Sequence, residues 1–246
     1  MARQRVSRRR VLGAGAGLSA AALGSRSVAE QLHQRMPWAP SAADRPEAPV
    51  TGAGHFFFTP DEAAFIEAAL ARLIPSDEQG PGAVEAGVAR FLDRQLAGPY
   101  GHGDHFYLKG PRPKGEPTQG WQMASPAEAY RAAIVAVNRY AADAKGKPFA
   151  RLSPVDQDAV LTALEKGEAE LKGGPPAKAF FELLLQNAIE GFFADPLYGG
   201  NRDMAGWKLI GFPGARYDYR DYVGKHGQPY PLPPVGLMGR PGWSRR

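Results

Sequence analysis

Apolar residues recur at intervals of three and four positions in five stretches of the chain, and this spacing predicts five amphipathic helices. The predicted helices begin near Pro60, Pro81, Pro126, Pro154 and Pro176. Proline is favoured at the first position of a helix, because the N–H that it lacks would have no partner there. The second predicted helix runs to Ala97, where Gly98 and Pro99 end it, and the Gly- and Pro-rich residues 98–124 predict a long irregular loop.

Three of these helix starts carry the residues of a capping box. The sequences are Thr59-Pro60-Asp61-Glu62, Ser125-Pro126-Ala127-Glu128 and Ser153-Pro154-Val155-Asp156. In this motif the Ser or Thr side chain accepts a hydrogen bond from the backbone three residues later, and the acidic side chain accepts one in return. We therefore expect the first helix to begin at Thr59 and to end at Pro75.

The fifth predicted helix, at about residues 176–194, is apolar around nearly its whole circumference. Its large apolar residues are Phe180, Phe181, Leu183, Leu184, Leu185, Ile189, Phe192 and Phe193. A narrow polar stripe of Lys178, Glu182, Gln186 and Glu190 is left to face water. This pattern favours the central helix of a bundle, with partial cover by another chain as the alternative.

The helical period is lost after Asp195, and the chain becomes rich in aromatic residues. They are Tyr198, Trp207, Phe212, Tyr217, Tyr219, Tyr222 and Tyr230. A disordered segment is usually poor in aromatic residues, so this one either packs on the chain's own helices or binds a partner protein. The predicted fold is mainly α: a small irregular bundle of about five helices with long loops and an aromatic-rich, extended C-terminal segment.

The N-terminus has the pattern of a twin-arginine signal peptide. Arg8 and Arg9 precede a weakly apolar run, and Ser27-Val28-Ala29 supplies small residues for cleavage. An arginine-rich arm that binds nucleic acid or lipid is disfavoured by the apolar run behind the arginines. We predict a signal peptide at 1–29, a Pro-rich flexible linker at 30–54, a helical domain at 55–222 and an extended tail at 223–246. The expected location is the periplasm or the periplasmic face of the inner membrane.

Net charge and composition exclude several classes of function for the mature chain. Six arginines and no acidic residue precede Glu30, so removal of residues 1–29 would change the formal charge from +5 to −1. Such a chain has no electrostatic preference for nucleic acid. Without cysteine it has no thiolate ligand for an iron–sulfur cluster or zinc and no cysteine-linked haem, and no nucleotide-binding motif occurs. We therefore expect no cofactor in this chain.

One short segment could bind a metal ion. His102-Gly103-Asp104-His105 places two imidazoles and a carboxylate within four residues. A metal site would need further ligands and support from surrounding side chains, so a solvated loop or a subunit contact is the favoured interpretation.

Residues 192–219 resemble the signature of the gluconate 2-dehydrogenase subunit 3 family. This run reads Phe-Phe-Ala-Asp-Pro-Leu-Tyr-Gly-Gly-Asn-Arg-Asp-Met-Ala-Gly-Trp-Lys-Leu-Ile-Gly-Phe-Pro-Gly-Ala-Arg-Tyr-Asp-Tyr. The helix start at Phe58-Thr59-Pro60 and the helix end at Leu73-Ile74-Pro75 are also similar to that family. The resemblance extends over roughly residues 55–222.

This resemblance implies a non-catalytic small subunit of a periplasmic sugar or sugar-acid dehydrogenase. In such complexes a large flavoprotein of the glucose-methanol-choline type holds FAD, and a multihaem cytochrome c subunit carries haem c. The small subunit is expected to escort the flavoprotein through the twin-arginine translocase and to stabilise it. Membrane association would come through the complex or an uncleaved signal.

The resemblance supplies no catalytic residues, and it marks one set of residues as candidates for contacting a partner or folding the tail. They are Tyr198, Asn201, Trp207, Phe212, Arg216 and Tyr217. Two rival functions stay open. One is an independent periplasmic metal-dependent enzyme that uses the His102/His105 loop, and the other is a free-standing periplasmic binding module.

Overall fold

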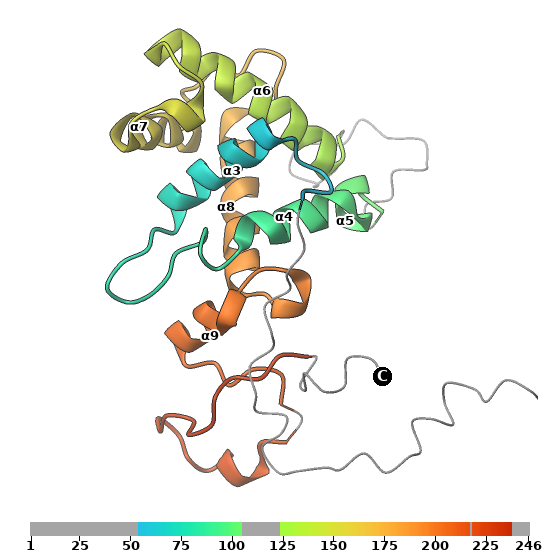
Figure 1. Ribbon diagram of the computed structural model, residues 1–246, viewed down its shortest axis with the longest axis vertical. Coiled ribbons are helices and arrows are strands. Elements are labelled where there is room, and N and C mark those ends of the chain that lie inside the picture. Colours follow the sequence, from blue (N-terminus) through green and yellow to red (C-terminus); the bar gives the residue numbers. More distant parts are fainter. Residues whose placement is uncertain (1–53, 105–123, 217, 238–246) are drawn as a thin grey trace, which may run out of the picture. The chain divides into compact units, whose positions relative to one another are not determined.

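Helices make up the regular structure of this chain. The computed structural model describes residues 54–104, 124–216 and 218–237 (Figure 1). The α-helices in these residues are α3 (Pro60–Leu73), α4 (Val88–Ala97), α5 (Pro99–His102), α6 (Pro126–Lys145), α7 (Pro154–Glu165), α8 (Ala177–Phe193) and α9 (Ala205–Ile210). Short 3₁₀ helices are η4 (Phe149–Arg151), η5 (Pro196–Tyr198), η6 (Arg202–Met204) and η7 (Arg220–Tyr222). The described residues contain no β-strand, so the mainly α class is confirmed. The predicted signal peptide at 1–29 and nearly all of the linker lie outside the described residues.

The predicted helix starts are confirmed at α3, α6 and α7. The Thr59 hydroxyl accepts a hydrogen bond from the backbone N of Glu62, and the Glu62 carboxylate accepts one from the backbone N of Thr59. Ser125 and Glu128 form the same reciprocal pair at the start of α6. At α7, Ser153 Oγ accepts from the backbone N of Asp156. Each proline occupies the first turn, where no donor is needed.

The second helix begins later than the periodicity predicts. We expected it from about Pro81, whereas α4 begins at Val88, after a loop that folds back on the end of α3. In that loop the backbone N of Ala83 donates to the Ile74 carbonyl at 2.9 Å. A Cβ on Gly82 would lie 2.5 Å from the same carbonyl oxygen, so only glycine permits this approach. Gly87, at φ 76°, then turns the chain into α4.

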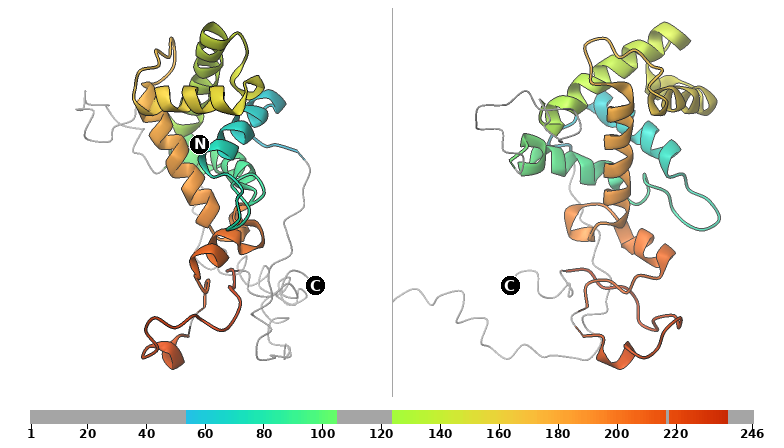
Figure 2. Two further views of the ribbon diagram at one scale, coloured as in Figure 1. Left: turned by 90° about the vertical axis from the view of Figure 1, so that its left-hand side faces the viewer. Right: turned by 180° about the vertical axis from the view of Figure 1, so that it is seen from behind.

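The prediction that the fifth helix is central is confirmed. Helix α8 contacts α3, α4, α6, α7 and α9, and Figures 1 and 2 show the other helices arranged along its length. Its buried side chains include Phe180, Phe181, Leu184 and Phe192, which join one hydrophobic core. Two helices were absent from the five predicted ones: the single turn of α5, and α9, which forms where the sequence showed only a short apolar patch.

A polar cluster lies within this core. Tyr130 is fully buried, and burial raises the pKa of its phenol well above the usual 10, so the hydroxyl stays protonated. It donates to Asn187 Oδ1 at 2.9 Å, and the Tyr100 hydroxyl bonds to the same amide. Asn187 Nδ2 also donates to Glu190 at 3.0 Å. Asn187 carries the one side-chain amide in the buried face of α8. This amide thus has hydrogen-bond partners on α5, on α6 and on its own helix.

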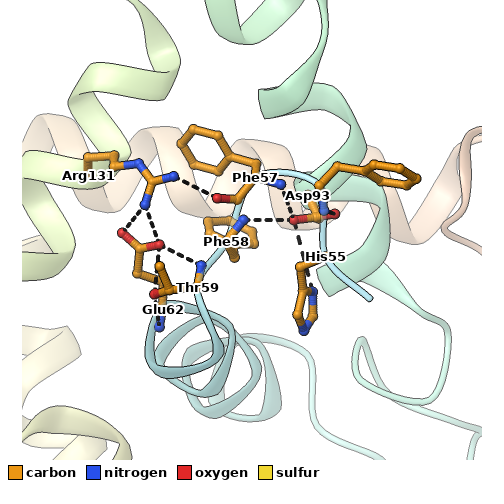
Figure 3. A network of polar contacts seen from close by, with 8 residues as sticks. His55, Phe57, Phe58, Thr59, Glu62, Asp93 and Arg131 are labelled. Atoms are coloured by element: carbon orange, nitrogen blue, oxygen red, sulfur yellow. Dashed lines mark hydrogen bonds and ion pairs between the residues drawn. The ribbon is translucent and has the colours of Figure 1, made fainter. Parts of the chain in front are cut away.

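A buried carboxylate fixes the chain where it enters the bundle (Figure 3). Asp93 of α4 is 2% exposed and accepts hydrogen bonds from the backbone N atoms of Phe56, Phe57 and Phe58, at 2.7, 2.9 and 2.9 Å. The three amides supply the partners that a buried carboxylate needs. We call this arrangement the Asp93 latch.

Arg131 of α6 ties a second helix to the same segment. Its guanidinium pairs with Glu62 of α3, donates to the Phe57 carbonyl, and lies 4.3 Å from the centre of the Phe57 ring. Burial acts to raise the pKa of Glu62, but hydrogen bonds from the Thr59 backbone and from Arg131 outweigh it, so the pKa lies below the usual 4.5. Helices α3, α4 and α6 are therefore joined through residues 56–62.

None of the described helices is long and apolar enough to span a membrane.

Replacing Asp93 with alanine should strongly destabilise the domain. Three backbone N–H groups would lose a charged acceptor, and we expect the free energy of unfolding to fall by about 3 kcal/mol. Chemical denaturation of the full chain measures the change. The matched control is Asp143→Ala, because Asp143 is exposed on α6, and it should change stability by less than about 0.5 kcal/mol. Equal effects of the two variants would show that the latch contributes nothing specific.

Candidate functional site

A buried amide organises the chain immediately after α8. Asn201 is completely buried, and its Nδ2 donates to the Ala194 carbonyl at 2.8 Å while its Oδ1 accepts from the backbone N of Gly206 at 2.9 Å. Its backbone is left-handed, with φ 44°, a conformation that asparagine tolerates better than most residues. Asn201 therefore holds the turn after α8 and the start of α9 in one arrangement.

Glycines let this segment lie directly on the end of α8. A Cβ on Gly200 would lie 2.1 Å from the Gly191 carbonyl oxygen, and one on Gly206 would lie 2.3 Å from the Phe192 carbonyl oxygen. Gly191 itself leaves room for the ring of Phe91 from α4. The sequence indicated turns here but not these contacts, because a glycine that admits a neighbouring backbone looks in sequence like a glycine that turns the chain.

Trp207 fastens α9 to the bundle. Its indole is buried, and Nε1 donates to the Phe193 carbonyl at 2.8 Å. The Phe212 ring packs edge-on against it, with ring centres 5.1 Å apart. Because α9 is held at its Trp207 side, the next residues of the helix turn outward.

The outer side of α9 presents apolar side chains. Leu209, Ile210 and Phe212 are 46, 60 and 43% exposed. Beside Leu209 lies an open pocket of about 180 Å³, between α9 and the loop after α3. Its apolar lining is Leu73, Ile74, Pro75, Pro81, Phe192, Ala205 and Leu209. The polar residues Asp77 and Gln79 also line this pocket. We call Leu209, Ile210, Phe212 and this pocket together the α9 surface, and exposed apolar groups of this kind often mark interaction sites.

The structure separates the six residues that the sequence singled out. Asn201 and Trp207 are buried and hold the segment together, whereas Phe212 and Tyr198 are substantially exposed. The Arg216 guanidinium donates to the Pro233 carbonyl and lies 5.1 Å from the centre of the Tyr230 ring. Tyr217 lies outside the described residues. The set therefore combines residues that organise the fold with residues that are open to contact.

Residues beyond α9 pack against their own chain. Gly214 and Val235 form a β-bridge, and Val235 is buried. The backbone N of Leu237 donates to Asp195 Oδ2 at 2.7 Å, so the end of the described chain returns to the end of α8. The Tyr230 ring centre lies 4.6 Å from that of Tyr222 and 5.9 Å from that of Tyr219. Much of the aromatic content is thus used within this segment.

The proposed metal ligands lie at the end of α5. His102 and Asp104 are both exposed there, and His105 lies outside the described residues. Among the residues that the structure describes, no group of three His, Asp or Glu side chains could hold a metal ion. The metal hypothesis stays a prediction about a loop of which only two candidate ligands are described.

Comparison with known proteins places these features in a family. A family model described as "Gluconate 2-dehydrogenase subunit 3" matches residues 60–214, which run from the first residue of α3 to the glycine that pairs with Val235. The match spans more than half of the chain and contains the whole α9 surface. No curated protein and no solved structure matches the chain significantly.

Replacing Asn201 with alanine should release α9 from the bundle. The substitution removes both hydrogen bonds and leaves a strained left-handed residue, so trypsin should cut after Lys208 at least about ten times faster. Limited proteolysis with mass spectrometry measures this rate. Asn138→Ala is the control, because Asn138 also accepts a backbone hydrogen bond, from Phe149, at the end of α6. If both variants are cut after Lys208 at the same rate, Asn201 does not organise this segment.

Proposed function

The chain belongs to the gluconate 2-dehydrogenase subunit 3 family, and from this premise we propose that it is a non-catalytic small subunit that escorts and stabilises an FAD-dependent large subunit. Subunit 3 of a dehydrogenase is one component of a complex with several subunits. The large subunit of this proposal oxidises a sugar or sugar acid with its own FAD, and a cytochrome subunit with haem c accepts the electrons. In this proposal the chain contributes a binding surface and no catalytic group.

The α9 surface is the observation that carries the proposal. It lies within the residues matched by the family model, and its position depends on specific contacts of Asn201 and Trp207. A chain that needed this segment only for its own core would gain nothing from leaving Leu209, Ile210 and Phe212 exposed. Exposed apolar side chains on a rigidly held helix are suited to bind a preformed partner.

The N-terminal residues support the escort role. Arg8 and Arg9 have the twin-arginine pattern, and this export route is suited to proteins that fold before they cross the membrane. The sequence contains no nucleotide-binding motif and no cysteine. We therefore propose that the signal also exports the flavoprotein, which would fold around FAD in the cytoplasm and cross while bound to this chain. The complex would then work on the periplasmic side.

Replacing Arg8 and Arg9 with lysine should retain both proteins in the cytoplasm. The translocase would no longer recognise the pair, so dehydrogenase activity in the periplasmic fraction should fall at least about tenfold. Arg3→Lys with Arg5→Lys is the matched control, because it makes the same change outside the motif, and it should leave export intact. Normal periplasmic flavoprotein in the Arg8/Arg9 variant would contradict the escort role.

Introducing charge on the α9 surface should break the complex. Leu209→Glu with Ile210→Glu would place two carboxylates against an apolar partner, and we expect the affinity for the large subunit to fall at least about a hundredfold, or roughly 2.7 kcal/mol. Co-purification and titration measure the loss. Val135→Glu with Val155→Glu, at exposed positions on α6 and α7, should leave binding unchanged. Unaltered binding of the α9 variant would move the interface elsewhere.

A further inference from the structure

Three arginine side chains lie near one another where α4 packs against the turn that follows η5. Arg90 and Arg94 lie one helical turn apart on α4, and Arg202 begins η6. The backbone N of Arg202 donates to the Ala86 carbonyl at 2.8 Å, which fixes this turn beside the start of α4. Arg202 is more than a hundred residues from Arg90 and Arg94 in the sequence.

Two glycines lie next to these side chains, at positions where any other residue would carry a Cβ. A Cβ on Gly199 would lie 3.1 Å from Arg94 Nη1 and 3.5 Å from Arg90 Cγ. A Cβ on Gly87 would lie 3.5 Å from Arg202 Nη2. Both glycines have positive φ, at 102° and 76°. Because neither carries a side chain, the guanidinium groups of Arg94 and Arg202 rest close to backbone.

The charges of Arg94 and Arg202 act on Arg90. Burial lowers the pKa of Arg90, and the charges of Arg94 and Arg202 lower it further, while Asp93 acts in the opposite direction. Asp93 already accepts three backbone hydrogen bonds in the latch. Like charges four residues apart on a helix also weaken it.

Other arginines show how this chain usually pairs such groups. Arg72 pairs with Asp158, Arg131 with Glu62, and Arg220 with Asp218. In the part of the chain that the structure describes, no carboxylate pairs with Arg94 or Arg202. Arg94 and Arg202 are therefore available to pair with acidic groups of another molecule.

We propose that Arg94 and Arg202, beside Arg90, bind a carboxylate-rich segment of the large subunit. The inference rests on the proposed function, since it names a second contact in the same complex. Guanidinium groups bind carboxylates with paired hydrogen bonds. Leu197 and Tyr198, which directly precede Gly199, are both exposed and add apolar contact, and arginine with tyrosine is the composition typical of interface hot spots. Three cations spread over two elements suit several carboxylates of a peptide better than one small anion.

The test measures the affinity of the full chain for the purified large subunit from about 50 to about 500 mM NaCl. Wild-type affinity should fall with salt. Arg94→Gln with Arg202→Gln should weaken binding at least about tenfold at low salt and should largely remove the salt dependence. Arg139→Gln with Arg151→Gln, two exposed arginines on other elements, should behave as wild type. Arg94→Lys with Arg202→Lys keeps the charge and should retain most of the salt dependence.

Each other outcome overturns a distinct claim. Unchanged affinity and salt dependence in the Gln variant would overturn the arginine contact while leaving the complex in place. Equal losses in the Gln and Lys variants would assign these side chains to packing, and would overturn it too. If the wild-type chain binds inorganic phosphate saturably and the Gln variant does not, the ligand of this cluster is a small anion and not an acidic segment of the large subunit. If the wild-type chain does not bind the large subunit at any salt concentration, the proposed function itself is wrong.

Discussion

The structure depends on the need to cover α8. A helix that is apolar around most of its circumference is stable in water only when other elements enclose it. Helices α3, α4, α6 and α7 provide most of that cover, and the segment around Asn201 provides the rest at the C-terminal end. The residues after α8 are therefore part of the core's enclosure, and the outer side of α9 is the face that this enclosure leaves exposed.

Short sequence motifs predicted those parts of the fold that depend on interactions between residues close together in the sequence. The capping residues Thr59, Ser125 and Ser153 mark real helix starts because each motif is complete within four residues. The start of α4 was placed too early because its position depends on Gly82 meeting the backbone around Ile74, a contact that no periodicity reveals. Helix α9 was missed because six residues are too few to show a helical period.

The sequence predicted where the candidate site lies, but not the different roles of its residues. The sequence indicated the segment from Tyr198 onward, yet it could not tell that Asn201 and Trp207 face inward while Leu209 and Ile210 face outward. That distinction depends on hydrogen bonds to the carbonyls of Ala194 and Phe193, which only the folded chain brings near. The arginine cluster had no sequence signature for the same reason, because only folding brings Arg202 near the arginines of α4.

The Asp93 latch has a consequence for which side chains the entry to the bundle can carry. Asp93 accepts hydrogen bonds from main-chain amide groups, which every residue except proline supplies, so the exposed position 56 can carry any other side chain. Position 57 is more restricted, because the Phe57 ring lies against the Arg131 guanidinium. The latch therefore fixes the path of the chain into the bundle through main-chain groups, and the identity of the exposed side chain at position 56 does not affect its hydrogen bond to Asp93.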